Sequence, residues 1–142
     1  MQKNNPLRLV IDTNLWISFL ISDREKKLDR ILSLKNVRVL FSYELLNEIT
    51  ETVRYPRLRK FFKEDAIEEM LLQLEPFIEV VQTSSKVNIC RDIKDNFLLS
   101  LSKDGSASFL LTGDKDLLIL QQFEKTKIVT IADFLNIVKT TS

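Results

Sequence analysis

The chain has 142 residues, 44% of them hydrophobic, and its 21 basic residues nearly balance its 20 acidic residues, leaving a formal net charge of +1. This length predicts one compact domain over residues 1–142, and an anionic partner would have to bind a local basic patch because the net charge is so small. The chain has no histidine, which excludes Ser–His and Cys–His nucleophile pairs, imidazole acid–base catalysis and His-ligated zinc.

The cysteine and glycine content narrows the chemistry further. Cys90 is the single cysteine and cannot form an intramolecular disulfide, which predicts a reducing, cytoplasmic location. Gly105 and Gly113 are the only glycines, too few for the paired-glycine loops that bind nucleotides. The apolar run 15–21 is shorter than the roughly 18 residues of a membrane span, so neither membrane insertion nor a signal peptide is expected. Polar chemistry is therefore expected from carboxylates, lysines and arginines.

The hydrophobic patterns predict alternating strands and helices along the chain. In chain order these are strand 8–12, helix 15–20, helix 26–34, strand 37–41, helix 43–53, helix 63–74, strand 77–81, helix 95–101, strand 107–111, helix 115–120, strand 127–129 and helix 131–138. Ser42 is a suitable N-cap, Thr13 or Asn14 can cap the first helix, and Pro56 ends or kinks helix 43–53. The alternation predicts an α/β fold, a three-layer α/β/α sandwich with a mainly parallel central sheet, and such sheets bind ligands beyond the C-terminal strand ends.

Acidic residues stand at the ends of these predicted elements. Asp12 directly follows the first strand, and Asp114 follows strand 107–111, so both are expected at the same edge of the sheet. Asp95 begins a helix, whose positive dipole end stabilises a carboxylate. Glu48 lies within a helix, at the border of its apolar stripe. Taken singly, each aspartate can be an ordinary helix cap and Glu48 an ordinary solvated side chain.

Together, the four segments that carry these acids resemble the motifs of PIN domains. The segments are Val10-Ile-Asp12-Thr-Asn14, Ser42-x-Glu-Leu-Leu-x-Glu48, Arg91-Asp-Ile-Lys-Asp95-Asn96-Phe97 and Leu111-Thr-Gly-Asp114-Lys-Asp116-Leu117-Leu118. Their order and spacing resemble most closely the bacterial PIN group assigned as toxins of toxin–antitoxin pairs. Ile93 stands where many relatives have proline, and a serine-rich turn at Ser106 replaces a frequent glycine, but neither departure removes a candidate ligand.

The resemblance implies a metal-dependent ribonuclease. It assigns catalysis and metal binding to Asp12, Glu48, Asp95 and Asp114, with Asp116 and Asp92 as candidate outer members. Oxygen-only ligands select Mg²⁺ or Mn²⁺, which would activate a water to hydrolyse an RNA phosphodiester without a side-chain nucleophile. The polar groups of Thr13, Asn14 and Thr112 can orient the ligands or simply serve as caps and turns.

Residues 54–63 are the candidate RNA-binding segment, because five cations and three aromatic residues are concentrated there. The cations are Arg54, Arg57, Arg59, Lys60 and Lys63. The alternative is that Leu58, Phe61 and Phe62 pack inward and the cations are merely solvated.

Several functional alternatives remain open at this point. A toxin would pair with a small antitoxin that blocks the acidic groove, and related domains are often homodimers. A housekeeping RNA-processing nuclease and a non-catalytic module for RNA binding or assembly are the two alternatives. A receiver domain would have paired acids early in the chain, and an aspartyl phosphatase would have an acid where this chain has Asn14.

Overall fold

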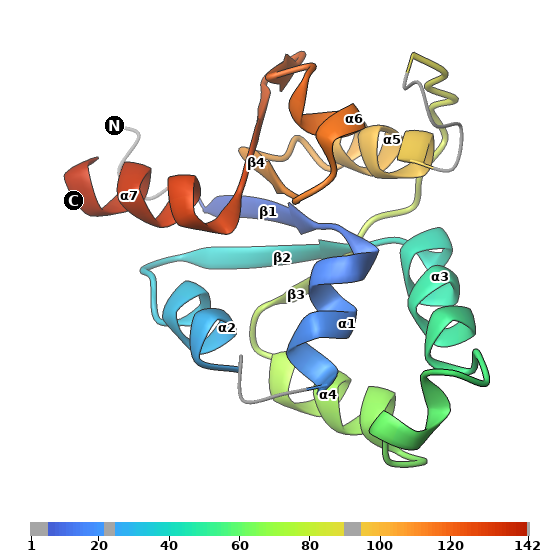
Figure 1. The fold of residues 1–142 in the computed structure, drawn as a ribbon. Helices are drawn as coiled ribbons and strands as arrows, with labels where there is room; N and C mark the ends of the chain where they lie inside the picture. Colours follow the sequence, from blue (N-terminus) through green and yellow to red (C-terminus); the bar gives the residue numbers. More distant parts are fainter. Residues whose placement is uncertain (1–5, 22–24, 90–94, 142) are drawn as a thin grey trace.

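A six-stranded sheet forms the centre of the computed structural model, which describes residues 6–21, 25–89 and 95–141 (Figure 1). The strands are β1 Leu7–Ile11, β2 Val37–Phe41, β3 Ile78–Val80, β4 Phe109–Leu111, β5 Gln122–Phe123 and β6 Thr126–Val129. Their order is β3-β2-β1-β4-β6-β5, and the pairs are parallel except for β5 with β6. The predicted α/β fold with a mainly parallel sheet is confirmed. The short β5 was not predicted, because two residues are too few to show an alternating pattern.

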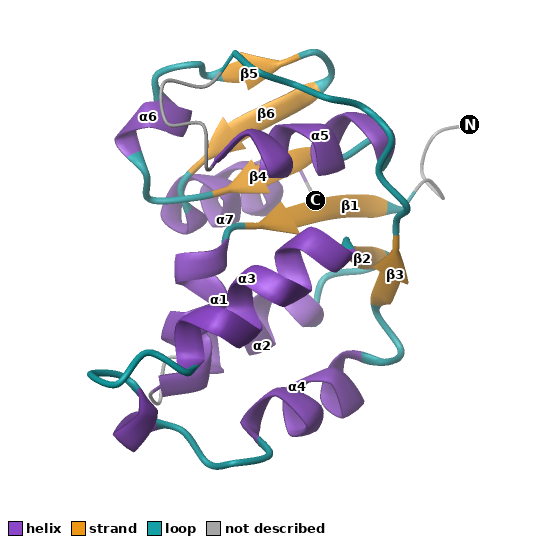
Figure 2. Ribbon diagram, turned by 90° about the vertical axis from the view of Figure 1, so that its right-hand side faces the viewer, coloured by secondary structure: helices purple, strands orange, loops and turns teal. Residues whose placement is uncertain are grey.

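Helices cover both faces of this sheet. They are α1 Thr13–Ile21, α2 Glu25–Leu32, α3 Tyr43–Val53, α4 Ala66–Leu74, α5 Asn96–Asp104, α6 Lys115–Leu118 and α7 Ile131–Thr141, with a 3₁₀ turn, η1, at Arg59–Phe61. Figure 2 shows α5 in front of β4 and α7 behind it. Among the described residues, no helix combines the length and the apolar character that a bilayer crossing requires.

Local sequence explains where α3 and α4 begin. The N–H of Leu45 donates to Ser42 Oγ at 3.1 Å, so the predicted N-cap of α3 is confirmed. Helix α4 begins at Ala66, three residues later than predicted, because residues 63–65 form a turn closed by the Ala66 N–H donating to the Lys63 carbonyl at 3.1 Å. Helix α3 ends at Val53, before Pro56, so the proline stops the helix and does not kink it.

The central strands and the first helix form a tightly packed core. Residues Leu9 to Ile11 of β1 are fully buried, as are Leu110 and Leu111 of β4. The fully buried ring of Trp16 packs against Phe19 and Phe41, with ring centroids 5.8 and 5.1 Å away. This packing provides a rigid base for the C-terminal ends of β1 and β4, which lie side by side.

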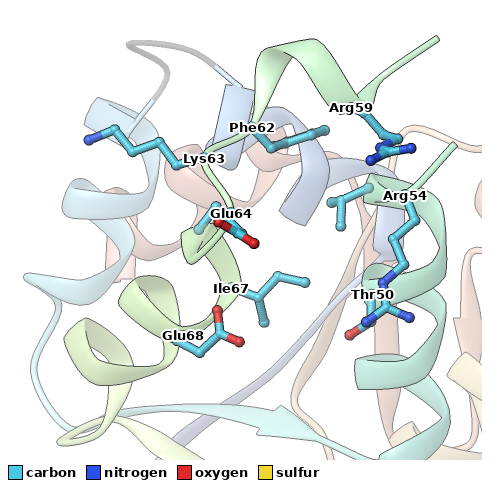
Figure 3. A pocket seen from close by; sticks show the side chains of 10 residues that line it. Thr50, Arg54, Arg59, Phe62, Lys63, Glu64, Ile67 and Glu68 are labelled. Carbon is cyan, nitrogen blue, oxygen red and sulfur yellow. The ribbon is translucent and has the colours of Figure 1, made fainter. Parts of the chain in front are cut away.

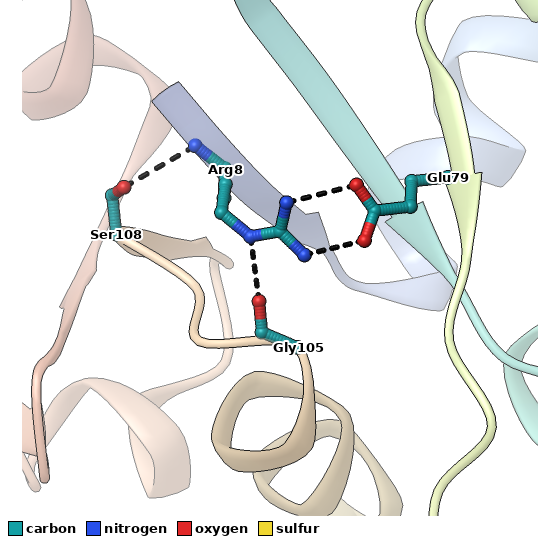
Figure 4. Close-up of polar contacts among 4 residues, drawn as sticks. All are labelled: Arg8, Glu79, Gly105 and Ser108. Atoms are coloured by element: carbon teal, nitrogen blue, oxygen red, sulfur yellow. Dashed lines mark hydrogen bonds and ion pairs between the residues drawn. The ribbon is translucent and has the colours of Figure 1, made fainter. Parts of the chain in front are cut away.

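Arg8 clamps several elements together near the start of β1 (Figure 4). Its Nη1 and Nη2 atoms donate to the two carboxylate oxygens of Glu79, at 2.8 and 2.6 Å. Its Nε donates to the carbonyl of Gly105 at 2.7 Å, and its backbone N–H donates to Ser108 Oγ at 3.2 Å. Hydrogen bonding to Arg8 lowers the pKa of the Glu79 carboxyl below its ordinary value. The clamp therefore ties β1 to β3 and to the end of α5.

Candidate functional site

Four acidic side chains from four different elements line one cavity of about 170 Å³. Asp12 follows β1, Glu48 lies on α3, Asp95 precedes α5, and Asp114 precedes α6. The first and last of these come together because β1 and β4 are parallel neighbours, so their C-terminal ends open on the same edge of the sheet. The other described residues that line the cavity are Thr13, Asn14, Thr52, Phe97 and Leu98.

Asp12 is the most buried of these acids, with 5% of its surface exposed. Its Oδ1 accepts a hydrogen bond from the Leu15 N–H at 2.9 Å, and its Oδ2 accepts one from the Thr112 hydroxyl. Burial raises the pKa of the Asp12 carboxyl, and the negative charge of Asp114 raises it further, although these two hydrogen bonds act in the opposite direction. A cation in the cavity would remove this unfavourable burial of negative charge.

Two of the aspartates also cap helices. The bond from Leu15 makes Asp12 the cap of α1, so the expectation that Thr13 or Asn14 fills this role is wrong, because Thr13 is already helical. Asp114 caps α6 by accepting the Asp116 N–H at 2.8 Å. Asp95 stands at the N-cap of α5, but its side chain makes no capping hydrogen bond. The capping explanation therefore holds for Asp12 and Asp114 and is wrong for Asp95.

Thr112 connects the first and fourth acidic segments. Its side chain is 1% exposed, and its hydroxyl donates to Asp12 while accepting the Asp114 N–H at 3.0 Å. Asp116 is half-buried in the first turn of α6 and does not line the cavity. Asp92 lies outside the described residues, as does Cys90.

The model for the PIN domain matches residues 8–116, which is more than half of the chain and contains all four acids. The chain is a PIN-domain protein. An uncharacterized protein of Methanocaldococcus jannaschii is 33% identical to this PIN domain over 123 residues, which cover 84% of this chain and 78% of that protein. The crystal structure of Mycobacterium tuberculosis VapC20, a sarcin–ricin loop cleaving toxin, shares the fold with a TM-score of 0.58 at 15% identity, over 82% of this chain and 97% of that chain.

The donor groups of the PIN-domain cavity fit a hard divalent cation. All four acids offer carboxylate oxygens, which magnesium and manganese prefer. Across residues 6–21, 25–89 and 95–141, no three acidic side chains are already close enough to hold one ion together. Magnesium does not require such a cluster, because one or two carboxylates hold it while waters complete its octahedron.

The basic segment of the PIN domain faces a different cavity, of about 550 Å³ (Figure 3). Arg54, Arg59 and Lys63 line it, and Glu64 and Glu68 lie across from the two arginines, on the side of Lys63. Arg57 and Lys60 are exposed and do not line it. The basic segment therefore meets two opposing carboxylates in a cavity of its own, and it adds no cation to the lining of the acidic cavity.

Helix α3 separates the two cavities. Glu48 and Thr52 line the acidic cavity, whereas Thr50, Val53 and Arg54 line the basic one. At about 100° per residue, Glu48 and Thr50 point roughly 160° apart around the helix, so the two sets occupy opposite sides. Phe62 is half-buried and packs against the core, Leu58 is half-buried, and Phe61 is 51% exposed. The alternative that these three side chains pack inward is therefore confirmed for Phe62 and wrong for Phe61.

Sequence reasoning did not anticipate three of the cavity-lining residues, Thr52, Phe97 and Leu98. A signal for Thr52 was present, because it lies one helical turn after Glu48 and so shares its face. Phe97 and Leu98 follow Asp95 in the first turn of α5, and their pattern indicated only an amphipathic helix.

Proposed function

We propose that this PIN-domain protein is an endoribonuclease that hydrolyses RNA phosphodiesters with bound Mg²⁺ or Mn²⁺, and that it is the toxin of a toxin–antitoxin pair. The observation that carries the proposal is the convergence of Asp12, Glu48, Asp95 and Asp114 on one cavity at the C-terminal edge of a parallel sheet. Membership of the PIN family and the all-oxygen donor set support it.

The surroundings of each acid suggest its part in the reaction. Asp12 is held through both oxygens by Thr112 and Leu15, so it is oriented for a central position at the ion. Glu48, Asp95 and Asp114 would hold the ion with Asp12, directly or through water, and Asp116 would be an outer member. When bound, the cation supplies an activated water and stabilises charge on the phosphate and the leaving oxygen. Among the described residues, no side chain lining the cavity is a histidine or cysteine nucleophile, which agrees with attack by water.

RNA would contact both sides of α3 in this proposal. Thr52 and Val53 are adjacent in the chain but line different cavities, so the C-terminal half of α3 is the boundary between the acidic and the basic cavity. A single strand lying over this boundary places one phosphate at the carboxylates and another near Arg54 and Arg59. Lys63, which also lines the basic cavity, and the exposed Arg57 and Lys60 then add electrostatic attraction.

The toxin assignment is a separate part of the proposal. It rests on the motif resemblance and on the shared fold with a toxin that cleaves the sarcin–ricin loop. A small antitoxin would block the acidic cavity, with a basic side chain placed among the carboxylates. Growth arrest on expression, relieved by Asp12→Asn, is expected of a toxin. A housekeeping RNA-processing nuclease would be active in vitro without arresting growth.

Cleavage of a generic single-stranded RNA tests the nuclease proposal. We expect cleavage with Mg²⁺ or Mn²⁺, none in EDTA, and a loss on the order of 100-fold or more in Asp95→Asn. Asp133→Asn is the matched control, because Asp133 is exposed on α7 and lies outside the cavity. Cleavage that persists in EDTA and in Asp95→Asn would disprove the mechanism. Metal-independent RNA binding without cleavage would instead identify a non-catalytic module.

A further inference from the structure

The hydroxyl of Thr13 is an unexplained polar group in the wall of the acidic cavity. Thr13 lines the cavity, and its Oγ1 is shielded from solvent without a hydrogen-bond partner among the described residues. The usual structural use of a threonine at this place is to cap the helix, but Asp12 already caps α1. A buried hydroxyl without a partner is unfavourable, so its presence at a site requires an explanation.

The two other threonine hydroxyls near this cavity are committed to intramolecular bonds. Thr52 donates to the Glu48 carbonyl at 2.7 Å, within its own helix. Thr112 donates to the Asp12 carboxylate and accepts the Asp114 N–H. Thr13 differs from both, because its hydroxyl remains available for a group that enters the cavity.

The chemistry of the cavity indicates what that group is. Four of the described lining residues are carboxylates, which only accept hydrogen bonds when ionised. An RNA phosphate also presents only acceptor oxygens, so it requires donors that the carboxylates do not provide. With the Thr52 hydroxyl committed to its own helix, the side-chain donors in the described lining are the Thr13 hydroxyl and the Asn14 amide. A helical threonine has two accessible χ1 rotamers, so the hydroxyl can turn toward a ligand without backbone movement.

We propose that the Thr13 hydroxyl donates a hydrogen bond to a non-bridging phosphate oxygen of the RNA strand in this cavity, which makes Thr13 a substrate-binding residue. This proposal rests on the ribonuclease function proposed above. It predicts that removal of the hydroxyl impairs the reaction without loss of stability, since the hydroxyl makes no bond inside the described protein.

Three full-length variants test this inference. Thr13→Val removes the hydroxyl and keeps the shape, and Thr13→Ser keeps the hydroxyl. Thr126→Val is the control, because it removes a buried hydroxyl that donates to the Ala107 carbonyl at 2.8 Å and does not line the acidic cavity. We expect kcat/KM for single-stranded RNA to fall about 10- to 100-fold in Thr13→Val, the loss typical of a hydrogen bond to a charged group, and to stay within about threefold of wild type in Thr13→Ser. The Tm should be unchanged or higher in Thr13→Val and lower in Thr126→Val, whose activity is retained.

Binding of labelled single-stranded RNA in Ca²⁺, measured by fluorescence anisotropy, separates this inference from the proposed function. Weaker binding by Thr13→Val supports the inference even if the wild-type protein binds RNA without cleaving it, in which case the nuclease function fails alone. Unchanged binding and unchanged kcat/KM in Thr13→Val overturn the inference while the function stands. A lower Tm in Thr13→Val also overturns it, because the hydroxyl then has a structural partner. A wild-type protein that neither binds nor cleaves RNA overturns both.

Discussion

The two glycines of this chain should respond in opposite ways to alanine. Gly105 follows α5 with φ −90° and ψ 0°, a conformation open to any residue, so only the available space matters. A Cβ atom there would lie 2.7 Å from Leu40 Cδ1, 3.0 Å from the Leu101 carbonyl oxygen and 3.3 Å from Val81 Cγ2. Leu40 is fully buried, and the Leu101 carbonyl accepts the Gly105 N–H at 2.8 Å, so neither can easily move away.

The size of the effect follows from these contacts. Overpacking of a filled site reduces the free energy of unfolding by about 1–3 kcal/mol, which for a domain of this size lowers Tm by roughly 4–12 °C. At Gly113 no atom beyond the two chain neighbours lies within 4 Å of an added Cβ, and the φ angle is not positive. Alanine there restricts only the unfolded chain, which should stabilise the fold by about 0.4–1 kcal/mol.

Urea unfolding followed by tryptophan fluorescence provides the assay. Trp16 is the single tryptophan and is fully buried against Phe19 and Phe41, so its emission reports loss of the core. Gly113→Ala is the matched control for Gly105→Ala. Equal shifts of the same sign, or a Gly105→Ala variant within about 0.5 kcal/mol of wild type, would refute the close packing of the α5 terminus against β2.

Three further predictions concern the clamp, the acidic cavity and the basic segment. Because the pKa of Glu79 is lowered in the folded protein, its contribution to stability is present above its unfolded pKa of about 4.3 and is lost as pH falls through the folded value. Glu79→Gln should therefore lower the free energy of unfolding by at most about 1 kcal/mol at pH 7, since both partners are partly exposed. The difference from wild type in urea unfolding should shrink toward pH 3, and a constant difference would contradict this. Thr112→Val should lower the free energy of unfolding, measured by thermal unfolding, by about 1–3 kcal/mol, because it leaves Asp12 and the Asp114 N–H without their shared partner. Thr112→Ser should stay near wild type. Replacing Arg54 and Arg59 with glutamine should weaken single-stranded RNA binding and reduce the slope of log K against log salt concentration by up to about 1.4. An unchanged slope, or an equal effect of the exposed control Lys127→Gln, would reject the basic segment as a phosphate contact.

Local patterns were sufficient to predict the main elements and the position of the acids. The apolar runs at 8–12 and 107–111 identify strands buried on both faces, and an acid directly after such a strand must lie at the sheet edge. Ser42 could be assigned as a cap because the N–H that its hydroxyl accepts, that of Leu45, is only three positions further along the chain. These inferences succeed because each depends on residues only a few positions apart.

Contacts between distant residues were beyond such reasoning. Arg8 and Glu79 are 71 positions apart, and nothing in either local pattern indicates their pairing. The basic segment follows the helix of Glu48 in the chain, but its position relative to the four acids was not predicted. Counting the helical phase from Glu48 to Arg54 would have placed them on different sides of α3, but the basic cavity itself depends on how η1 and α4 fold back.

Asp12 and Asp114 both line the acidic cavity and cap a helix, and this limits which substitutions can inactivate the PIN domain without unfolding it. Each carboxylate both lines the acidic cavity and anchors the first turn of a helix, so alanine would abolish charge and anchor together. Asparagine removes the charge but keeps an oxygen for the helix. A descendant of this chain that drifts into inactivity is therefore expected to carry asparagine, serine or threonine at these two positions, and its sequence would still resemble that of a working enzyme.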